Sequence, residues 1–322
     1  MILVSVIIVT HNSSSVIGGC ISSISMNCTA GNYEVIVVDN DSTATEKEFL
    51  RSVSGIDTLL LHDKNSGFGT ANNIGSKAAR GDYLLFLNPD TVLLNDIISI
   101  FLEATKELDT FGVLGVWQKN PDLSENHSYG RFEDHRIRCF IRNEYRQNIL
   151  KQCTSLFGIK RFKKLLRPSS QPVRNDSVQE RMRFTHVDWI NGACLFLKKQ
   201  VFFDIGCFDE HIFLFSEEVD LQKRLLNNGY YSYLVDTPLL IHLHEDKRKM
   251  GNRTRIEFYR GYFVYAKKYN LSLHYCMLRF SMLVILIIGS FLDLFTRRYS
   301  VSENIRCIKS VCSHLELNRT SV

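Results

Sequence analysis

Short apolar runs alternate with longer stretches of helical length throughout the first 120 residues, and this alternation restricts the chain to few folds. The runs are rich in Val, Ile and Leu, which is typical of parallel strands covered by helices on both faces. Right-handed crossovers join such strands, so the pattern predicts an α/β domain. We expect strands at Val4 to Val9, Tyr33 to Val38, Leu59 to Leu61 and Tyr83 to Leu87, with helices at Ser14 to Ser25, Ala44 to Val53 and Gly69 to Ala79.

The composition is that of a globular protein with a locally basic segment. The chain has 322 residues, 45% of them hydrophobic, and a formal net charge of +5. Arg131 to Arg183 holds 14 Lys/Arg against 5 Asp/Glu, which suits an anionic partner such as a diphosphate or lipid headgroups, or a solvated surface. No nucleic-acid-binding motif accompanies this charge, so no nucleic-acid partner is expected.

The cysteines and the N-terminal segment both favour a cytoplasmic protein. The nine cysteines are scattered and form no CxxC pair, which predicts reduced thiols. The segment MILVSVIIVTHN has no basic region before its apolar run and no small-residue cleavage site, so we interpret it as a buried strand and not as a signal peptide.

Polar residues follow three of the predicted strands, in the sequences Thr10-His11-Asn12, Asp39-Asn40-Asp41 and Asn88-Pro89-Asp90. In an open α/β sheet the ligand crevice lies beyond the carboxyl ends of the strands, so these residues should face one site. Asn88 and Asp90 supply oxygen ligands for Mn²⁺ or Mg²⁺ and leave positions open for diphosphate oxygens. The alternative is an Asn-Pro-Asp turn that caps the next helix.

The alternation of apolar runs and helical stretches stops after about residue 120 and resumes later in the chain. We expect a basic insertion or lid over 120–185, order again at Val187 to Leu197, and a helix that opens at Ser216 to Asp220 and stops near Asn228-Gly229. A strand at Ser232 to Val235 then leads towards Leu239 to His244. The predicted organisation is a catalytic domain over 1–245, made of a donor half (1–120), the insertion (120–185) and an acceptor half (186–245), followed by a helical region over 246–322.

The helical tail contains thirteen uncharged residues, Phe280 to Leu292. A spanning helix needs about 20 apolar residues, so this segment is too short to cross a bilayer. Beside Arg297-Arg298 it could lie in a membrane interface. Alternatively it packs in the core or forms a homo-oligomer.

Four motifs in the donor half occur in one order: VSVIIVTHN, EVIVVDNDS, NSGFGTANNIG and LLFLNPDT. Together they resemble the family 2 glycosyltransferases of the GT-A fold, especially the bacterial rhamnosyltransferase-like branch with its N-P-D-T metal motif. The resemblance covers about residues 3 to 245. It implies a mixed, mostly parallel central sheet with helices on both faces, a C-terminal helical appendage, and a metal-dependent, inverting hexosyltransferase that uses a nucleotide sugar.

The resemblance also implies a donor site. Thr10 and Asn12 would line the nucleotide pocket, and Asp39 would accept a hydrogen bond from the N3–H of a pyrimidine, unless it only caps the helix near Ser42. The remaining donor residues implied by the motifs are Asn65, Gly67, Asn72 and Asn88. In the loop with Gly67 and Gly69, the missing side chains would let the backbone approach the ligand, and Asn73 could instead be a packing or capping residue.

On the acceptor side, Asp188, Trp189 and Gly192 resemble the strand and turn that bind the acceptor, where an aromatic ring can stack on a sugar; ordinary core packing is the alternative for Trp189. Phe213 to Leu221 resembles the family's E-D-V-D segment, whose second acid is the general base. That position is Glu218 here.

The base and the last metal ligand each have alternatives. Glu stands where relatives usually carry Asp, so Glu217 and Asp220 remain open as the base, and either could instead cap a helix or bind an Arg. Where the family commonly has a histidine in the metal or diphosphate site, this chain has His242 and His244. We choose His242, because it directly follows an apolar run.

The rhamnosyltransferase resemblance implies dTDP-L-rhamnose as donor and a polyprenyl-diphosphate-linked saccharide as acceptor, in the synthesis of a bacterial O-antigen or capsule. The enzyme would then be peripheral on the inner face of the cytoplasmic membrane. UDP-hexoses, a non-catalytic nucleotide-sugar-binding subunit and a nucleotide-sugar hydrolase are the alternatives. A Rossmann dehydrogenase is disfavoured, because no GxGxxG follows the first strand.

Overall fold

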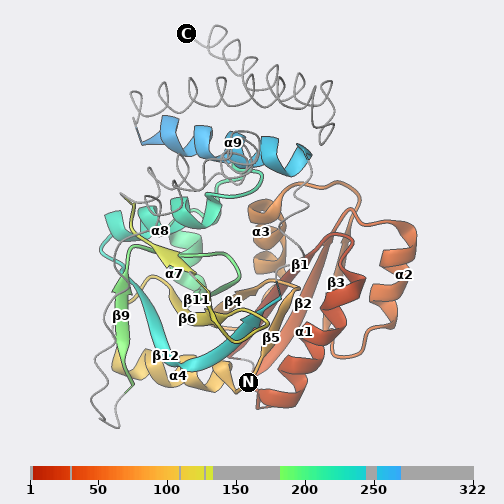
Figure 1. Ribbon diagram of the computed structural model, residues 1–322, viewed down its shortest axis with the longest axis horizontal. Coiled ribbons are helices and arrows are strands. Elements are labelled where there is room, and N and C mark those ends of the chain that lie inside the picture. Colours follow the sequence, from red (N-terminus) through yellow and green to blue (C-terminus); the bar gives the residue numbers. More distant parts are fainter. Residues whose placement is uncertain are drawn as a thin grey trace, which may run out of the picture. The chain divides into compact units, whose positions relative to one another are not determined.

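The predicted alternation of strands and helices forms the first half of the computed structural model (Figure 1). Each predicted strand and helix of this half is confirmed to within two residues at either end. The elements are β1 (Val4–Thr10), α1 (Ser14–Asn27), β2 (Tyr33–Asn40), α2 (Ala44–Ser52), β3 (Thr58–His62), α3 (Phe68–Ala78) and β4 (Tyr83–Leu87).

The second half differs more from expectation. The ordered segment expected at Val187 to Leu197 contains the end of one strand and two further strands, and the Asn191-Gly192 turn separates these two. The helix at Ser216 is confirmed, and it stops before Gly229, whose φ is 82°. The elements are β5 (Thr91–Leu93), α4 (Ile97–Glu107), β6 (Leu114–Lys119), β7 (Glu125–Asn126), β8 (Tyr129–Gly130), β9 (Phe184–Val187), β10 (Trp189–Ile190), β11 (Cys194–Lys198), α7 (Lys199–Asp204), α8 (Glu217–Asn227), β12 (Ser232–His242) and α9 (Asn252–Lys268).

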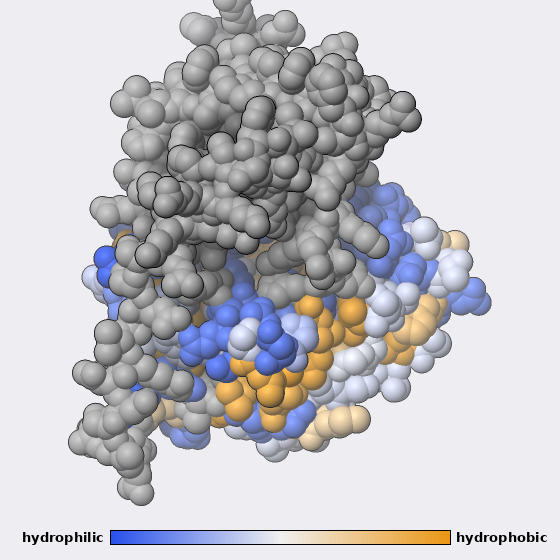
Figure 2. Space-filling view, in the orientation of Figure 1, coloured by the Kyte–Doolittle hydropathy of each residue, from blue (hydrophilic) through white to orange (hydrophobic). Residues whose placement is uncertain are grey.

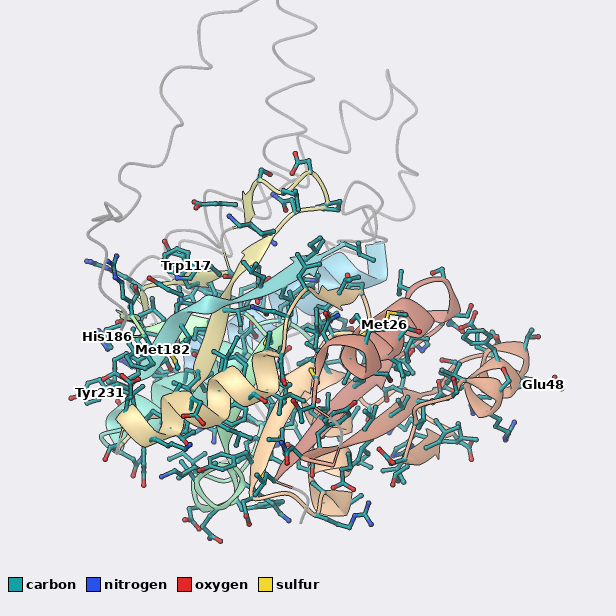
Figure 3. All side chains as sticks on the ribbon, turned by 90° about the horizontal axis from the view of Figure 1, so that it is seen from below. Met26, Glu48, Trp117, Met182, His186 and Tyr231 are labelled. Atoms are coloured by element: carbon teal, nitrogen blue, oxygen red, sulfur yellow. The ribbon has the colours of Figure 1, made fainter. Side chains whose placement is uncertain are left out.

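The main sheet is mixed and mostly parallel, as expected. Its strands run in the order β3-β2-β1-β4-β11-β6-β12-β5, with β7 beside β6 and β9 beside β12. Strands β1 to β4 are parallel to one another, and β11 is antiparallel to both of its neighbours, β4 and β6. β12 is parallel to β6. Strand β9 brings His186 beside Tyr231, with ring centroids 5.4 Å apart (Figure 3).

Helices cover both faces of this sheet (Figure 1), and alternate strand residues pack against each layer. On β1, Val6 and Ile8 belong to the apolar cluster of α1 and α4. Ile7 and Val9 point the other way and pack in the cluster that includes residues of α3, α7 and α8. Burial on both faces explains why β1 is apolar throughout and shows no alternation.

The structure describes residues 3–29, 31–108, 110–126, 128–132, 182–243 and 252–269. They belong to one compact unit, made of residues 1–132 and 182–269. This unit therefore extends past the expected boundary at 245 and includes α9. Most of the predicted basic insertion, and the apolar tail Phe280 to Leu292, lie outside the described residues.

The surface of the described part carries some large apolar side chains among polar ones. Figure 2 shows both kinds interspersed on the face turned to the viewer, with an apolar area low in the view. Met26 is 82% exposed and Leu123 is 62% exposed. Single exposed apolar residues are ordinary on soluble domains. No helix in the described ranges is long and apolar enough to cross a membrane.

Candidate active site

Three of the predicted site residues lie at one edge of the sheet. β1, β2 and β4 are parallel, so their carboxyl ends carry Thr10, Asp39 and Asn88 to the same side. β11 is antiparallel and starts at this edge, since Cys194 pairs with Leu87. The turn before β11 therefore lies beside the Asn-Pro-Asp segment, and the Asn88 amide donates to the Ala193 carbonyl over 3.0 Å.

Asp39 has a buried carboxylate with one unused oxygen. Its Oδ2 accepts from the Ser42 amide at 3.2 Å and lies 4.0 Å from Lys47 Nζ. Its Oδ1 is buried and has no hydrogen-bond partner. The N-cap of α2 is Thr43, so Asp39 holds the preceding turn and does not cap the helix. A buried acceptor without a partner suits an incoming N–H group.

Asn12 joins the loop after β1 to the turn before α2. Its backbone is left-handed, with a φ of 53°, and its backbone N–H donates to Ser42 Oγ over 2.8 Å. Its Oδ1 accepts from the Thr43 amide at 3.0 Å. Thr10 is buried and pairs in register with Asp39. Thr10 therefore lies at the end of β1 beside Asp39, and the role of Thr10 and Asn12 in nucleotide binding remains a prediction.

The loop before α3 is fixed by Asn40, a residue that the sequence prediction left without a role. Asn40 Nδ2 donates to Asn65 Oδ1 over 3.1 Å, and Asn65 Oδ1 also accepts from the Gly67 amide at 3.2 Å. Gly67 has a φ of 90°, and a Cβ there would lie 2.3 Å from the Phe213 carbonyl oxygen. The space expected for a ligand's approach is thus occupied by the protein's own backbone, which explains this glycine without a ligand.

The two asparagines of α3 differ in their contacts. Asn72 is buried and donates to the Phe68 carbonyl within its own helix over 3.1 Å. Asn73 donates to the Phe208 carbonyl at 3.0 Å and to Glu210 at 3.1 Å, and accepts from the Phe208 amide. Asn73 is therefore a packing residue that joins α3 to the segment before α8.

The Asn88-Pro89-Asp90 segment leads into a strand and not into a helix. β5 follows directly, and α4 begins only at Ile97, where Asp96 is the N-cap and accepts from the Ser99 amide. The alternative that Asn-Pro-Asp caps the next helix is therefore wrong. The turn is instead held by the Thr91 hydroxyl, which donates to the Asn88 carbonyl over 2.7 Å, while the buried Asn88 Oδ1 has no partner.

Asp90 lies against His242 because β5 pairs with β12. Thr91 is opposite His242 in the register, and the Leu243 amide donates to the Asp90 carbonyl over 2.8 Å. Asp90 Oδ1 and His242 Nε2 are 3.2 Å apart. His244 lies outside the described residues, so the observed contact favours the choice of His242.

The Asp90 and His242 side chains fit a divalent cation. Two adjacent ligands of an octahedral Mg²⁺ at about 2.1 Å lie about 3 Å apart, close to the separation seen here. Asn88 adds a buried oxygen without a partner. Within the described ranges no group of three or more His, Cys, Asp or Glu residues could hold a metal.

Two buried amides, Gln118 and Asn191, support His242, and the sequence prediction missed both. His242 Nδ1 lies 3.3 Å from Gln118 Oε1, and Gln118 Nε2 donates to Asn191 Oδ1 over 2.7 Å. A local signal existed for Gln118: it ends the buried alternation Leu114, Val116, Gln118 at the carboxyl end of β6. It was missed because β6 itself was not predicted.

The predicted acceptor residues are mostly engaged with their own chain. Asp188 Oδ2 accepts from the Phe132 amide at 2.8 Å, and Trp189 Nε1 donates to the Arg131 carbonyl over 3.1 Å. The Trp189 ring lies against Gly130, where a Cβ would be 2.4 Å from it. Gly192 faces the Phe68 ring, which a Cβ would meet at 3.3 Å. Asp188 and Trp189 therefore tie the β8 end to β10, and their acceptor role remains a prediction.

The segment before α8 has an unusual backbone. Phe215 and Ser216 have φ of 65° and 76°, in the left-handed region that non-glycine residues rarely adopt. α9 holds this segment in place: at Gly261, a Cβ would lie 2.3 Å from the Phe215 carbonyl oxygen. Such strain often occurs at functional sites, where the surrounding packing maintains it. Here it precedes Glu217 and Glu218, the first residues of α8.

Glu217 and Glu218 each have a buried oxygen without a partner. Burial raises the pKa of Glu218 to about 7, against the opposing effect of backbone N–H groups at Ser216, Glu218 and Val219. Burial and the neighbouring Glu218 charge raise the pKa of Glu217 well above its ordinary value. Glu217 is only 4% exposed, whereas Glu218 is partly exposed. A carboxyl group with a pKa near 7 has the proton affinity expected of a general base.

Asp220 has a structural environment instead. Its Oδ2 accepts from Arg224 Nε at 2.8 Å, and its Oδ1 lies 2.8 Å from Lys268 Nζ and accepts from the Tyr269 hydroxyl at 2.9 Å. The carboxylate is completely buried. With both oxygens occupied by donors, Asp220 anchors α9 on α8 and has no oxygen left to accept a substrate proton.

The fold and this strand-end site together define a glycosyltransferase of the GT-A type. The family described as Glycosyl transferase family 2 matches residues 5–166. The chain belongs to this family.

Two curated relatives are similar over most of their length. The chain is 24% identical over 260 residues to Rhamnosyltransferase WbbL of Escherichia coli K12, covering 78% of this chain and 88% of the relative. It is 26% identical over 257 residues to the N-acetylglucosaminyl-diphospho-decaprenol L-rhamnosyltransferase of Mycobacterium tuberculosis, covering 74% of this chain and 75% of the relative.

Solved structures share the fold. The mannosyltransferase PcManGT of Pyrobaculum calidifontis, in complex with GDP-Man and Mn²⁺, matches with a TM-score of 0.54 and 12% identity, covering 99% of this chain and 76% of that one. GalNAc-T7 with UDP, GalNAc and Mn²⁺ matches with a TM-score of 0.52 and 12% identity, covering 80% of this chain. The chain spans 47% of GalNAc-T7, about half its length.

Proposed function

We propose that this glycosyltransferase moves L-rhamnose from dTDP-L-rhamnose, with inversion, onto a polyprenyl-diphosphate-linked saccharide of bacterial surface-polysaccharide synthesis. Support comes from the relatives, two of which are named as rhamnosyltransferases. The name of the mycobacterial relative includes an acceptor linked through diphosphate to decaprenol. A lipid-linked acceptor would bring the enzyme to the cytoplasmic face of the membrane.

One structural observation carries the proposal. In the described part of the chain, the buried side-chain oxygens without a hydrogen-bond partner belong to Asp39, Asn88, Glu217 and Glu218. Folded proteins pair nearly all buried polar atoms, so unpaired ones concentrated in predicted site residues favour ligand binding there. All four are acceptors, which suits N–H and O–H donors or a cation.

The proposed reaction assigns one task to each end of the site. Asp39 Oδ1 accepts the N3–H of the thymine ring and so holds the nucleotide. Glu218, as a carboxylate, removes the proton from the acceptor hydroxyl while that oxygen attacks the anomeric carbon from the face opposite the diphosphate. The new bond to the acceptor oxygen forms as the bond to the diphosphate oxygen breaks. The proton ends on Glu218, and dTDP leaves.

Asn88, Asp90 and His242 would hold a Mn²⁺ or Mg²⁺ ion. When bound, the ion supplies positive charge that stabilises the departing diphosphate. The Mn²⁺ in two structural neighbours supports divalent metal use in this fold. In this chain the support is the close Asp90 and His242 pair and the unpaired Asn88 oxygen.

A thermal-shift panel tests the donor assignment. The protein is heated with dTDP-L-rhamnose, dTDP, UDP-glucose, UDP-N-acetylglucosamine or GDP-mannose, each with Mn²⁺ or with a chelator. We expect the largest Mn²⁺-dependent stabilisation with dTDP-L-rhamnose. Mass spectrometry of a reaction with N-acetylglucosaminyl-diphospho-polyprenol should then show a mass gain of one rhamnosyl unit.

Other outcomes would select the alternatives. Greater stabilisation and transfer with a UDP-hexose would replace rhamnose as the donor sugar. Release of free sugar at an unchanged rate without acceptor would indicate a hydrolase. Nucleotide-sugar binding without either product, over a range of acceptors, would indicate a binding subunit.

A further inference from the structure

The orientation of the Asn191 side chain is fixed by a backbone amide. The Ala193 N–H, which can only donate, points to Asn191 Oδ1 at 3.3 Å. The amide oxygen of Asn191 is therefore on that side, and its Nδ2 donates to Gln118 Oε1 over 3.3 Å. Gln118 Nε2 returns a hydrogen bond to Asn191 Oδ1 over 2.7 Å. This reciprocal contact, the Gln118–Asn191 amide pair, leaves one orientation for Gln118.

The orientation of Gln118 suits one tautomer of His242. Its Oε1 lies 3.3 Å from His242 Nδ1 and accepts a hydrogen bond when the ring hydrogen is on Nδ1. In the neutral ring, Nε2 then carries a lone pair. Nε2 lies 3.2 Å from Asp90 Oδ1, so a single cation can contact both atoms.

Gln118 and His242 are both buried, so the hydrogen bond between them is difficult to replace. Gln118 is 1% exposed and His242 is 7% exposed, so water cannot readily replace the lost partner of either group. Gln118 is opposite Leu240 in the β6–β12 register, two residues before His242, so strand pairing sets the distance between the side chains. The residue before Asn191 contacts α8, because the backbone amide of Ile190 donates to Gln222 Oε1 over 2.8 Å.

We propose that the Gln118–Asn191 amide pair positions His242 as a metal ligand, by holding its proton on Nδ1 and presenting Nε2 to a divalent cation shared with Asp90. Partners that orient a metal-bound histidine in this way typically change metal affinity by about 10–100-fold when they are removed. The inference rests on the proposed function, because the cation is the one assigned there to Asn88, Asp90 and His242.

The test measures Mn²⁺ binding directly, without turnover. Full-length wild type and the variants Gln118→Leu, Gln118→Glu and His242→Ala are titrated with Mn²⁺, and free Mn²⁺ is followed by its electron paramagnetic resonance signal. With ¹⁵N-histidine labelling, electron spin-echo modulation detects a nitrogen bound to Mn²⁺. Asn73→Leu is the control, because it removes a buried amide with several hydrogen bonds elsewhere.

We expect Gln118→Leu to weaken Mn²⁺ binding about 10–100-fold and to lose or reduce the histidine nitrogen signal. Gln118→Glu keeps an oxygen that accepts from Nδ1–H, so it should retain both properties far better. Asn73→Leu should lower the melting temperature and leave Mn²⁺ affinity at the wild-type value.

The outcomes separate the two proposals. If His242→Ala binds Mn²⁺ like wild type, the metal site of the proposed function is wrong. If His242→Ala loses affinity while Gln118→Leu retains it together with the nitrogen signal, the metal site stands and the positioning role is refuted. If Gln118→Glu is as impaired as Gln118→Leu, acceptance from Nδ1–H is not what matters, which also refutes the positioning role.

Discussion

Replacing Glu218 with Gln should abolish most activity and yet stabilise the protein. The two carboxylates at the start of α8 are buried together, and the charged form of Glu218 is disfavoured there. The ordinary pKa of 4.5 and the raised value of about 7, at about 1.4 kcal/mol for each pKa unit, give a cost on the order of 3 kcal/mol for charging this group in the folded state. Glutamine has the same shape without the charge.

The sign of the pH dependence follows from the raised pKa. Between about pH 4.5 and 7 the folded protein binds the Glu218 proton more tightly than the unfolded chain does, so the free energy of unfolding falls as pH rises through this window. The penalty is fully present above pH 7 and absent below pH 4.5. Glu218→Gln should therefore be more stable than wild type by on the order of 3 kcal/mol at pH 8, and the difference should vanish near pH 4.

The same substitution should lower activity although it raises stability. A general base contributes about 10²–10⁴-fold, so kcat/KM of Glu218→Gln should fall by that factor while nucleotide-sugar binding persists. Since the base must be deprotonated, wild-type kcat/KM should fall below pH 7 and reach about a tenth of its plateau at pH 6. The residual kcat/KM of Glu218→Gln should not show this fall below pH 7.

Guanidinium unfolding at pH 4, 6 and 8 and initial-rate kinetics over the same range provide the measurements. Glu48→Gln is the matched control, because Glu48 is exposed on α2 (Figure 3) and should change neither quantity appreciably. Wild-type activity in Glu218→Gln would falsify the base assignment. A destabilised variant at pH 8 would show that the carboxylate has favourable partners, contrary to the burial argument.

Three further changes address the rest of the site. Asp90→Asn should abolish the Mn²⁺-dependent part of donor binding measured by calorimetry; if a chelator still weakens donor binding to this variant as much as to wild type, Asp90 does not hold the metal. Asp39→Asn should weaken dTDP binding about tenfold, because a neutral acceptor replaces a charged one; an unchanged dissociation constant would remove Asp39 from base recognition. Asp220→Ala should destabilise the protein by about 3 kcal/mol in guanidinium, since Arg224 and Lys268 lose a shared buried acceptor; a loss below about 1 kcal/mol would contradict the anchoring role.

The amino-acid sequence alone was sufficient for the donor half of the sheet and for the edge of it at which the candidate residues lie. The strands there are continuous apolar runs, and the polar residues that end them, such as Asp39 and Asn88, follow by local order in the chain. Parallel pairing through crossover helices then puts their carboxyl ends at one edge, which is a general property of this kind of sheet. Local patterns were enough because burial on both faces leaves a signal within each segment.

Only the tertiary structure decided between residues that the sequence left equivalent. His242 became the favoured histidine because β12 pairs with β5, which places it beside Asp90. Asp220 was separated from Glu218 by Lys268, nearly fifty residues later in the chain and held on α9. Gln118 acquired a role only through a partner on another strand. Strand register and helix docking join segments far apart in the chain, and local periodicity records that a residue is buried but not which distant residue it meets.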